Sequence, residues 1–231
     1  MTGLADRAIP STQVLDPRGG LVGPLPEFAR DPGELAALYR AMVLTRTFDS
    51  KAIALQRTGR LGTYPSSLGQ EAVVVGVAAA MRRDDVFLPS YREHGAQLWR
   101  GVTLAELFLY WGGDERGNNF AGPRRDFPNC VPVGTNAPHA VGAAMALRLR
   151  GESSAAVCLF GDGATSKGDV AEALNMAGVW MVPAVFVINN NAWAISLPRK
   201  TQCVAATLAQ KAAAAGIPGE QVDGNDVIAV R

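Results

Sequence analysis

The 231-residue sequence predicts an α/β fold in which helices flank a parallel β-sheet. Two short apolar runs, residues 157–160 and 184–188, have the length and composition of buried parallel strands. A helical pattern lies between them, from about Asp169 to Trp180. A strand, a helix and a second strand in this order are typical of the crossover unit from which parallel sheets are built.

The first third of the chain is expected to contain an arm and two helices. Residues 1–30 hold four prolines and several glycines, which favour an extended arm lying on a partner subunit. Residues 31–34, Asp-Pro-Gly-Glu, form a helix start, and helical spacing continues to about Gln56. Residues 69–81 are small and apolar on nearly every face, which predicts a buried helix. We expect residues 31–231 to form one α/β domain.

The middle of the chain contains a predicted strand, three predicted helices and a long loop. The strand covers residues 86–88, and the helices cover 91–100, 103–110 and 136–150. Thr103 and Glu106 form a capping box at the start of the second helix. Residues 112–129 are polar and glycine-rich, and long loops of this kind often carry function.

Composition and charge exclude several classes of protein. Hydrophobic residues make up 48% and charged residues 19% of the chain, which suffices for one well-buried domain. The net charge of +1 gives no sign of a nucleic-acid or membrane partner. Three scattered cysteines suit a reducing compartment rather than a disulfide framework or a zinc site. Without a secretory signal or a long apolar run, a cytoplasmic location is expected.

Polar residues follow both apolar runs. Asp162 stands between two glycines after the first run, and three asparagines ending at Asn191 close the second. Parallel strands end at one sheet edge, so Asp162 and Asn191 are expected to meet there. Their oxygens suit Mg²⁺ or Ca²⁺, while the glycines and the helix start near Gly168 favour an anion. The pattern predicts a seat for a metal-bound diphosphate; the alternative is an ordinary turn with an Asp cap.

The spacing of these residues resembles a known motif. Asp162 and Asn191 lie 29 positions apart, similar to the thiamine diphosphate motif, in which GDG is followed by NN about thirty residues later. More narrowly, residues 161–196 resemble the alpha subunit of the thiamine-dependent 2-oxoacid dehydrogenases, a family that includes pyruvate, branched-chain 2-oxoacid and acetoin dehydrogenases. The resemblance runs from about Leu35 to the last residue, and it implies a thiamine diphosphate-binding fold.

The resemblance also implies a set of ligands. These are Asp162, Asn191 and the backbone carbonyl of Trp193 for Mg²⁺, Tyr91, Arg92, Gly163 and Ala164 for the diphosphate, and Val131 and Val133 for the aminopyrimidine ring. The family usually has Tyr or Phe in place of Trp193, a mild departure because the ligand is a backbone oxygen. Thr135 and Asn136 align with a K⁺-binding turn of some members.

Taken from the residues alone, some of these assignments have simpler alternatives. Tyr91 and Arg92 could equally begin a solvated helix with an ion pair. His94 is a candidate proton shuttle because it follows them closely, whereas His139 is expected to be structural. The family's catalytic histidine lies on a later loop that this sequence does not contain.

The resemblance implies an oxidoreductase that decarboxylates a small 2-oxoacid and transfers the acyl group to lipoyl groups of an acyltransferase core. The alpha subunit would hold the cofactor in an α2β2 tetramer, with the activating glutamate on the beta subunit. Residues 69–72 and 207–219 look most like bacterial pyruvate dehydrogenase subunits, with branched-chain 2-oxoacid or acetoin dehydrogenase as alternatives. Related subunits continue beyond Arg231, so a truncated, non-catalytic homologue that binds a partner is the alternative of another class.

Overall fold

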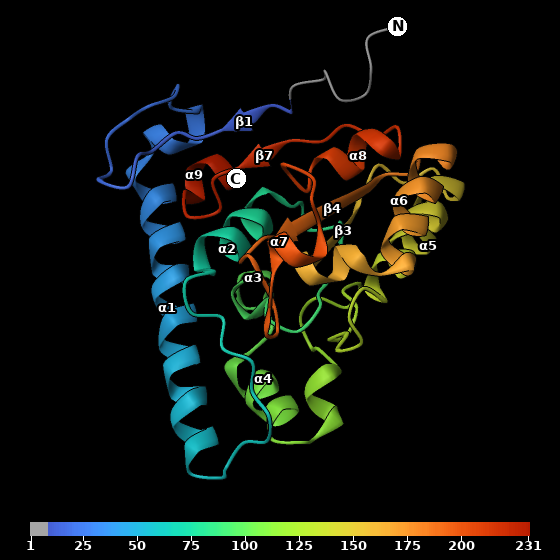
Figure 1. Ribbon diagram of the computed structural model, residues 1–231. Helices are drawn as coiled ribbons and strands as arrows, with labels where there is room; N and C mark the ends of the chain where they lie inside the picture. Colours follow the sequence, from blue (N-terminus) through green and yellow to red (C-terminus); the bar gives the residue numbers. More distant parts are fainter. Residues whose placement is uncertain (1–8) are drawn as a thin grey trace, which may run out of the picture. The chain divides into compact units, whose positions relative to one another are not determined.

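A computed structural model describes residues 9–231, so the first eight residues of the expected N-terminal arm lie outside the described part. The chain forms two compact units. The sheet unit comprises residues 9–12, 84–90 and 129–221, and the helical unit comprises residues 13–83, 91–128 and 222–231. Figure 1 labels many of the elements of both units.

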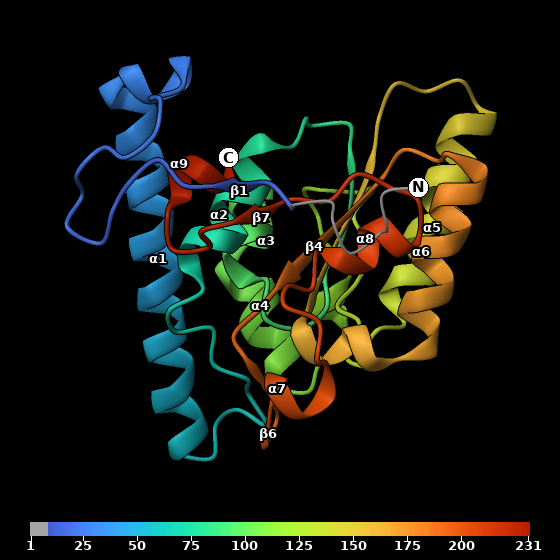
Figure 2. The ribbon, with the colours of Figure 1, turned by 45° about the horizontal axis from the view of Figure 1, so that its top comes forward.

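The sheet unit is built on three parallel strands. β2 (Val86–Leu88), β3 (Ala156–Gly161) and β4 (Ala184–Asn189) lie in the order β2-β3-β4, with Gly161 opposite Asn189. Two helices, α5 (Asn136–Leu149) and α6 (Gly168–Trp180), lie side by side against this sheet in both views (Figures 1 and 2). The predicted α/β fold with a parallel sheet is confirmed.

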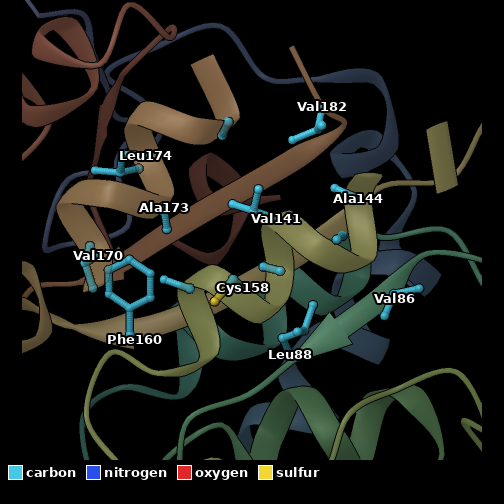
Figure 3. Close-up of a cluster of buried hydrophobic side chains, with 14 of the residues drawn as sticks. Val86, Leu88, Val141, Ala144, Cys158, Phe160, Val170, Ala173, Leu174 and Val182 are labelled. Carbon is cyan, nitrogen blue, oxygen red and sulfur yellow. The ribbon is translucent and has the colours of Figure 1, made fainter. Parts of the chain in front are cut away.

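The core of the sheet unit lies between these two helices and one face of the sheet. Figure 3 shows that alternate strand residues, including Leu88, Cys158 and Phe160, point toward side chains of α5 and α6. Most helix residues in this core are alanine or valine, such as Ala144 and Val170, and small side chains allow the helices to approach the sheet closely. The tight packing fixes the position of the strand ends, where the candidate site lies.

The helical unit is organised around a long first helix. Its helices are α1 (Pro32–Arg57), α2 (Glu71–Ala80), α3 (His94–Arg100), α4 (Leu104–Trp111) and α9 (Val227–Val230), with short 3₁₀ turns at Glu27–Arg30 and Glu115–Asn118. Asp31 caps α1, and Thr103 and Glu106 form the predicted capping box of α4. A Cβ on Gly95 would lie 2.6 Å from Thr45 Oγ1 and 2.8 Å from Val74, so this glycine allows α3 to pack tightly against α1 and α2.

The ends of the described chain contact each other within each unit. In the helical unit, the Asp226 carboxylate caps α9 and also accepts the backbone N–H groups of Val14 and Leu15 at 2.8 and 2.6 Å. In the sheet unit, the Gln221 N–H donates to the carbonyl of Pro10 at 2.8 Å, next to the short strand β1 (Ser11–Thr12). Much of the described segment before α1 therefore packs on its own chain.

Two differences from the expected elements concern the site. The helix expected from Tyr91 begins at His94. The reason is that the Glu93 carboxylate accepts a hydrogen bond from the Arg92 N–H at 2.9 Å, and such a local bond competes with a helical turn. After β4, a hairpin of β5 (Trp193–Ala194) and β6 (Leu197–Pro198) leads into α7 (Arg199–Gln202) and later α8 (Gln210–Ala214).

Within residues 9–231, no helix has the length and apolar character to cross a membrane.

Candidate functional site

The carboxyl edge of the sheet brings together the two segments that the sequence singled out. Asp162 directly follows β3 and opens a 3₁₀ turn, Asp162–Ser166, while Asn190 and Asn191 directly follow β4. Because Gly161 and Asn189 are paired in the parallel register, Asp162 and Asn191 leave the sheet at the same edge. The register of β3 and β4 thus places the two segments at the same edge, as the sequence predicted.

The hairpin after β4 packs directly onto the turn after β3. A Cβ placed on Gly163 would lie 2.7 Å from the Ala194 Cβ, a distance at which one of the two groups must move. Packing of the hairpin therefore requires a residue without a side chain at Gly163. Thr165 Oγ1 donates to the carbonyl of Asp162 at 2.7 Å and fixes the turn internally.

The Asp162 carboxylate is buried without a partner. Its residue is 2% exposed, and neither carboxylate oxygen has a hydrogen-bond partner. Burial raises the pKa of Asp162, and the nearby backbone N–H groups of Asp162 and Gly163 and the charge of Arg199 offset this only in part. A buried charge without compensation is strongly unfavourable, so this carboxyl group fits a bound cation.

Asn191 and Trp193 lie in a turn held by side-chain amides. Asn190 Oδ1 accepts the N–H of Ala192 at 3.1 Å, and Asn191 Oδ1 accepts the N–H of Trp193 at 2.9 Å. Ala192 has a φ of 65°, a left-handed conformation that these bonds and the Arg199 N–H to Ala192 carbonyl bond (2.8 Å) stabilise. An amide oxygen carries two lone pairs, so this bond leaves Asn191 Oδ1 with a second lone pair that can accept another partner.

The segment before α5 contributes two exposed valines. Val131 and Val133 are 50% and 41% exposed. Gly134 has a φ of 82°, and a Cβ there would lie 3.1 Å from Val170, so this turn rests against the start of α6. The Asn136 amide group donates to the carbonyls of Leu88 (3.3 Å) and Leu159 (2.8 Å) and joins the ends of β2 and β3.

Tyr91 and Arg92 belong to the helical unit, three residues beyond the end of β2 along the chain. The Arg92 guanidinium lies over the Tyr91 ring, 5.1 Å from its centroid, and its Nη1 donates to the carbonyl of Ser66 at 2.9 Å. The side chains are thus preorganised together in a bend, which suits recognition of an anion better than a solvated helix start does.

His94 does not have the environment of a proton shuttle. Its side chain is fully buried, with Nε2 accepting from Trp111 Nε1 at 2.9 Å and Nδ1 3.4 Å from the Tyr64 hydroxyl. Burial lowers the pKa of His94 to about 3, an effect that the charge of Asp49 only partly opposes. The ring is therefore neutral at physiological pH and is enclosed among aromatic side chains. His139 lies exposed on α5.

Sequence reasoning missed two groups of polar side chains. Gln202 accepts from Ser166 Oγ at 3.2 Å beside the Asp162 turn, and its Nε2, like Arg199 Nε, is buried without a hydrogen-bond partner. No local sequence pattern marks Gln202 or Arg199.

The second group centres on Asp49, which is 3% exposed on α1. Its signal was available, because Asp49 shares the apolar face of that helix with Phe48 and Ala52.

Comparison with known proteins gives the family. Residues 39–231 match the model of the dehydrogenase E1 component. This chain belongs to the dehydrogenase E1 component family. It is 47% identical over 192 residues to the 3-methyl-2-oxobutanoate dehydrogenase subunit alpha of Mycobacterium tuberculosis, an alignment that covers 83% of this chain and 52% of that protein. It is 41% identical over 220 residues to the pyruvate dehydrogenase E1 component subunit alpha of Staphylococcus aureus, covering 94% and 59%.

These relatives confirm the resemblance to E1 alpha subunits that the sequence predicted. The matched part of this chain spans between half and three-fifths of the length of these two relatives. The matched region contains Asp162 and Asn191 of the sheet unit and Tyr91 and Arg92 of the helical unit, so these candidate residues all lie within the E1 family match.

Proposed function

We propose that this chain is the alpha subunit of a 2-oxoacid dehydrogenase E1 component and that it holds thiamine diphosphate with Mg²⁺. The observation that carries this proposal is the buried Asp162 carboxylate, which has no hydrogen-bond partner at the sheet edge where the Asn191 turn begins. Magnesium takes few protein ligands and completes its shell with water and phosphate oxygens, which suits one carboxylate, one amide and one backbone carbonyl. When bound, thiamine diphosphate supplies the carbanion chemistry that decarboxylates a 2-oxoacid.

The chain's own residues would bind and orient the cofactor. Asp162, Asn191 and the carbonyl of Trp193 would hold the metal, and Tyr91 and Arg92 would hold the diphosphate. The backbone N–H groups of Gly163 and Ala164 would also face the diphosphate, and Val131 and Val133 would pack against the ring system. The Gly163–Ala194 contact supports this assignment because it holds the two metal-binding segments against each other.

Exposed apolar side chains around this edge support a partner subunit. Val131, Val133, Trp193, Ile195 and Leu197 are between 41% and 98% exposed, although all are apolar. Clusters of exposed apolar residues often mark protein interfaces. In the proposed α2β2 tetramer the beta subunit covers them and supplies the activating glutamate, and a lipoyl acyltransferase core accepts the acyl group.

The proposed substrate is pyruvate, with a branched-chain 2-oxoacid as the second candidate. The similarity of residues 69–72 and 207–219 to bacterial pyruvate dehydrogenase subunits supports the first. The 47% identity to a 3-methyl-2-oxobutanoate dehydrogenase subunit alpha favours the second. One methylene in an apolar pocket changes discrimination by about 1–3 kcal/mol, so a substrate panel with an artificial electron acceptor is needed to rank them.

The decisive experiment is Asp162→Ala in the chain reconstituted with its beta subunit. Magnesium-dependent binding of thiamine diphosphate, measured by calorimetry, should be lost. Asp169→Ala provides a matched control, because this exposed carboxylate lies in the first turn of α6 and should leave the affinity unchanged. Unchanged affinity in Asp162→Ala would reject the assigned site, and absence of 2-oxoacid turnover in the wild-type complex would favour a non-catalytic homologue.

A further inference from the structure

The helical unit contains a buried carboxylate that organises one short segment of the chain. Asp49 accepts hydrogen bonds from the Tyr64 hydroxyl (2.8 Å), Ser66 Oγ (2.7 Å), the Ser67 N–H (2.7 Å) and Ser67 Oγ (3.3 Å). All four donors lie within residues 64–67. Hydrogen bonds to an ionised carboxylate are stronger than neutral ones, so Asp49 fixes both the backbone and the side chains of this segment.

The segment fixed by Asp49 in turn holds Arg92. Ser66 donates its hydroxyl to Asp49 and accepts Arg92 Nη1 on its carbonyl, so two bonds through one residue connect the carboxylate to the guanidinium. An arginine side chain has many rotamers, and fixing it before an anion arrives lowers the entropy lost on binding. The path from Asp49 to Arg92 lies entirely within the helical unit.

Aromatic packing gives the segment a rigid support. The Tyr64 ring stacks on His94 at a centroid distance of 5.3 Å and meets Trp111 edge-on at 5.5 Å. Tyr64 and Ser67 are buried, whereas Ser66 is half-buried and carries the carbonyl that Arg92 contacts. Tyr64 and Ser67 are therefore held in the interior, and Ser66 contacts the bend that contains Arg92.

We propose that Asp49 is a positioning residue that sets the orientation of Arg92 and thereby the affinity of the chain for a diphosphate group. The inference rests on the proposed function, in which Arg92 binds the cofactor's diphosphate. Asp49 itself acts through Ser66 and does not touch the ligand. The predicted consequence is energetic coupling between positions 49 and 92 in cofactor binding.

A double-mutant cycle tests this coupling. Asp49→Asn, Arg92→Ala and the double variant are prepared in complex with the beta subunit, and the Kd for thiamine diphosphate with Mg²⁺ is measured by calorimetry, with Tm recorded for each. We expect each single variant to weaken binding about tenfold or more, the effect of one lost charge-assisted hydrogen bond. The double variant should be no weaker than Arg92→Ala alone, because without Arg92 the orientation has no effect on affinity.

A matched control separates positioning from a general loss of stability. Asp226 is another buried carboxylate of the same unit that accepts four backbone N–H groups, from Val14, Leu15, Ile228 and Ala229. Asp226→Asn should lower Tm without changing the Kd. If Asp49→Asn fails to fold, Ser66→Ala removes the hydroxyl that donates to Asp49, keeps the carbonyl that Arg92 contacts, and should show the same coupling to Arg92.

The possible results distinguish this inference from the proposed function. Additive losses in the cycle, or an unchanged Kd in Asp49→Asn, overturn the positioning role while leaving Arg92 as a ligand. An unchanged Kd in Arg92→Ala overturns the assignment of Arg92 and the positioning role together, whereas the Asp162→Ala experiment tests the metal site separately.

Discussion

Two buried aspartates, one in each unit, are almost equally inaccessible and have opposite surroundings. Asp162 in the sheet unit is 2% exposed and neither oxygen has a partner, whereas Asp49 in the helical unit is 3% exposed and accepts four hydrogen bonds. Burial raises the pKa of Asp162; at Asp49 burial acts in the same direction, but hydrogen bonds from Ser67, Ser66 and Tyr64 outweigh it and lower the pKa.

The contrast distinguishes a carboxylate whose partners are supplied by the chain itself from one that the proposed function assigns to a metal ion. In the helical unit, donors of residues 64–67 satisfy the buried charge of Asp49. At the edge of the sheet unit, the Asp162 carboxylate lacks hydrogen-bond partners and its burial is offset only in part, an arrangement that natural proteins retain mainly where function requires it. Substitutions at the two positions should therefore have opposite effects on the stability of the cofactor-free chain.

The largest effect is expected at Asp49. Asp49→Ala leaves four donors in residues 64–67 without an acceptor and should lower the free energy of unfolding by about 3–5 kcal/mol. Denaturant unfolding followed by far-UV circular dichroism measures this change. A loss below about 1 kcal/mol would contradict the view that this network is internally complete.

A pH effect should follow from His94, which adjoins the same network. The pKa of the buried ring is about 3, against 6.5 in the unfolded chain. Between these values the unfolded state binds the extra proton, so the contribution is fully present above pH 6.5 and is lost as the pH falls towards 3. The free energy of unfolding should drop by about 2 kcal/mol between pH 6.5 and 5.

Denaturant titrations at several pH values test this slope. His94→Gln should remove the slope, and His139→Gln, a change at an exposed position on α5, should keep it. A slope that persists unchanged in His94→Gln would assign the pH dependence to other groups.

At the sheet edge, Gly163→Ala tests the packing that joins the two candidate metal-binding segments. The added methyl group meets Ala194 at 2.7 Å, and the resulting overpacking should lower the free energy of unfolding by about 1–2 kcal/mol. Ala194→Gly in the same chain should restore most of this loss, as thermal unfolding would show. Additive destabilisation in the double variant would mean that the two residues are not in contact.

The smallest effect, and the one with opposite sign, is expected at Asp162. Asp162→Asn removes an uncompensated buried charge and should raise the free energy of unfolding of the cofactor-free chain by about 1 kcal/mol. The same variant should lose any increase in Tm that Mg²⁺ and thiamine diphosphate give the wild-type complex. Destabilisation of the cofactor-free chain would show that Asp162 is structural, like Asp49.

The sequence predicted strands β2, β3 and β4 and helices α5 and α6 of the sheet unit, and the place of the candidate site at the ends of β3 and β4. Short apolar runs ending in Asp162 and Asn191 indicate strand ends directly, because both signals are local. The hairpin and α7 after Asn191 could not be predicted, since side-chain amides and the contact with Gly163 shape them. The burial of Asp49 could have been inferred from its place on the apolar face of α1, but its donors could not, because they lie 15–18 residues away, beyond two chain-breaking glycines.

The hairpin that rests on Gly163 gives the chain an optical reporter of its own. The backbone N–H of Trp193 is bonded to the Asn191 side chain in the turn after β4, and the residue is 55% exposed. A solvent-exposed indole emits at longer wavelengths than one shielded from water, so docking of another chain over this ring should shift its fluorescence to the blue. In the proposed complex with a beta subunit, this blue shift should appear with the wild-type chain and be absent with Trp193→Phe, which keeps the other three tryptophans.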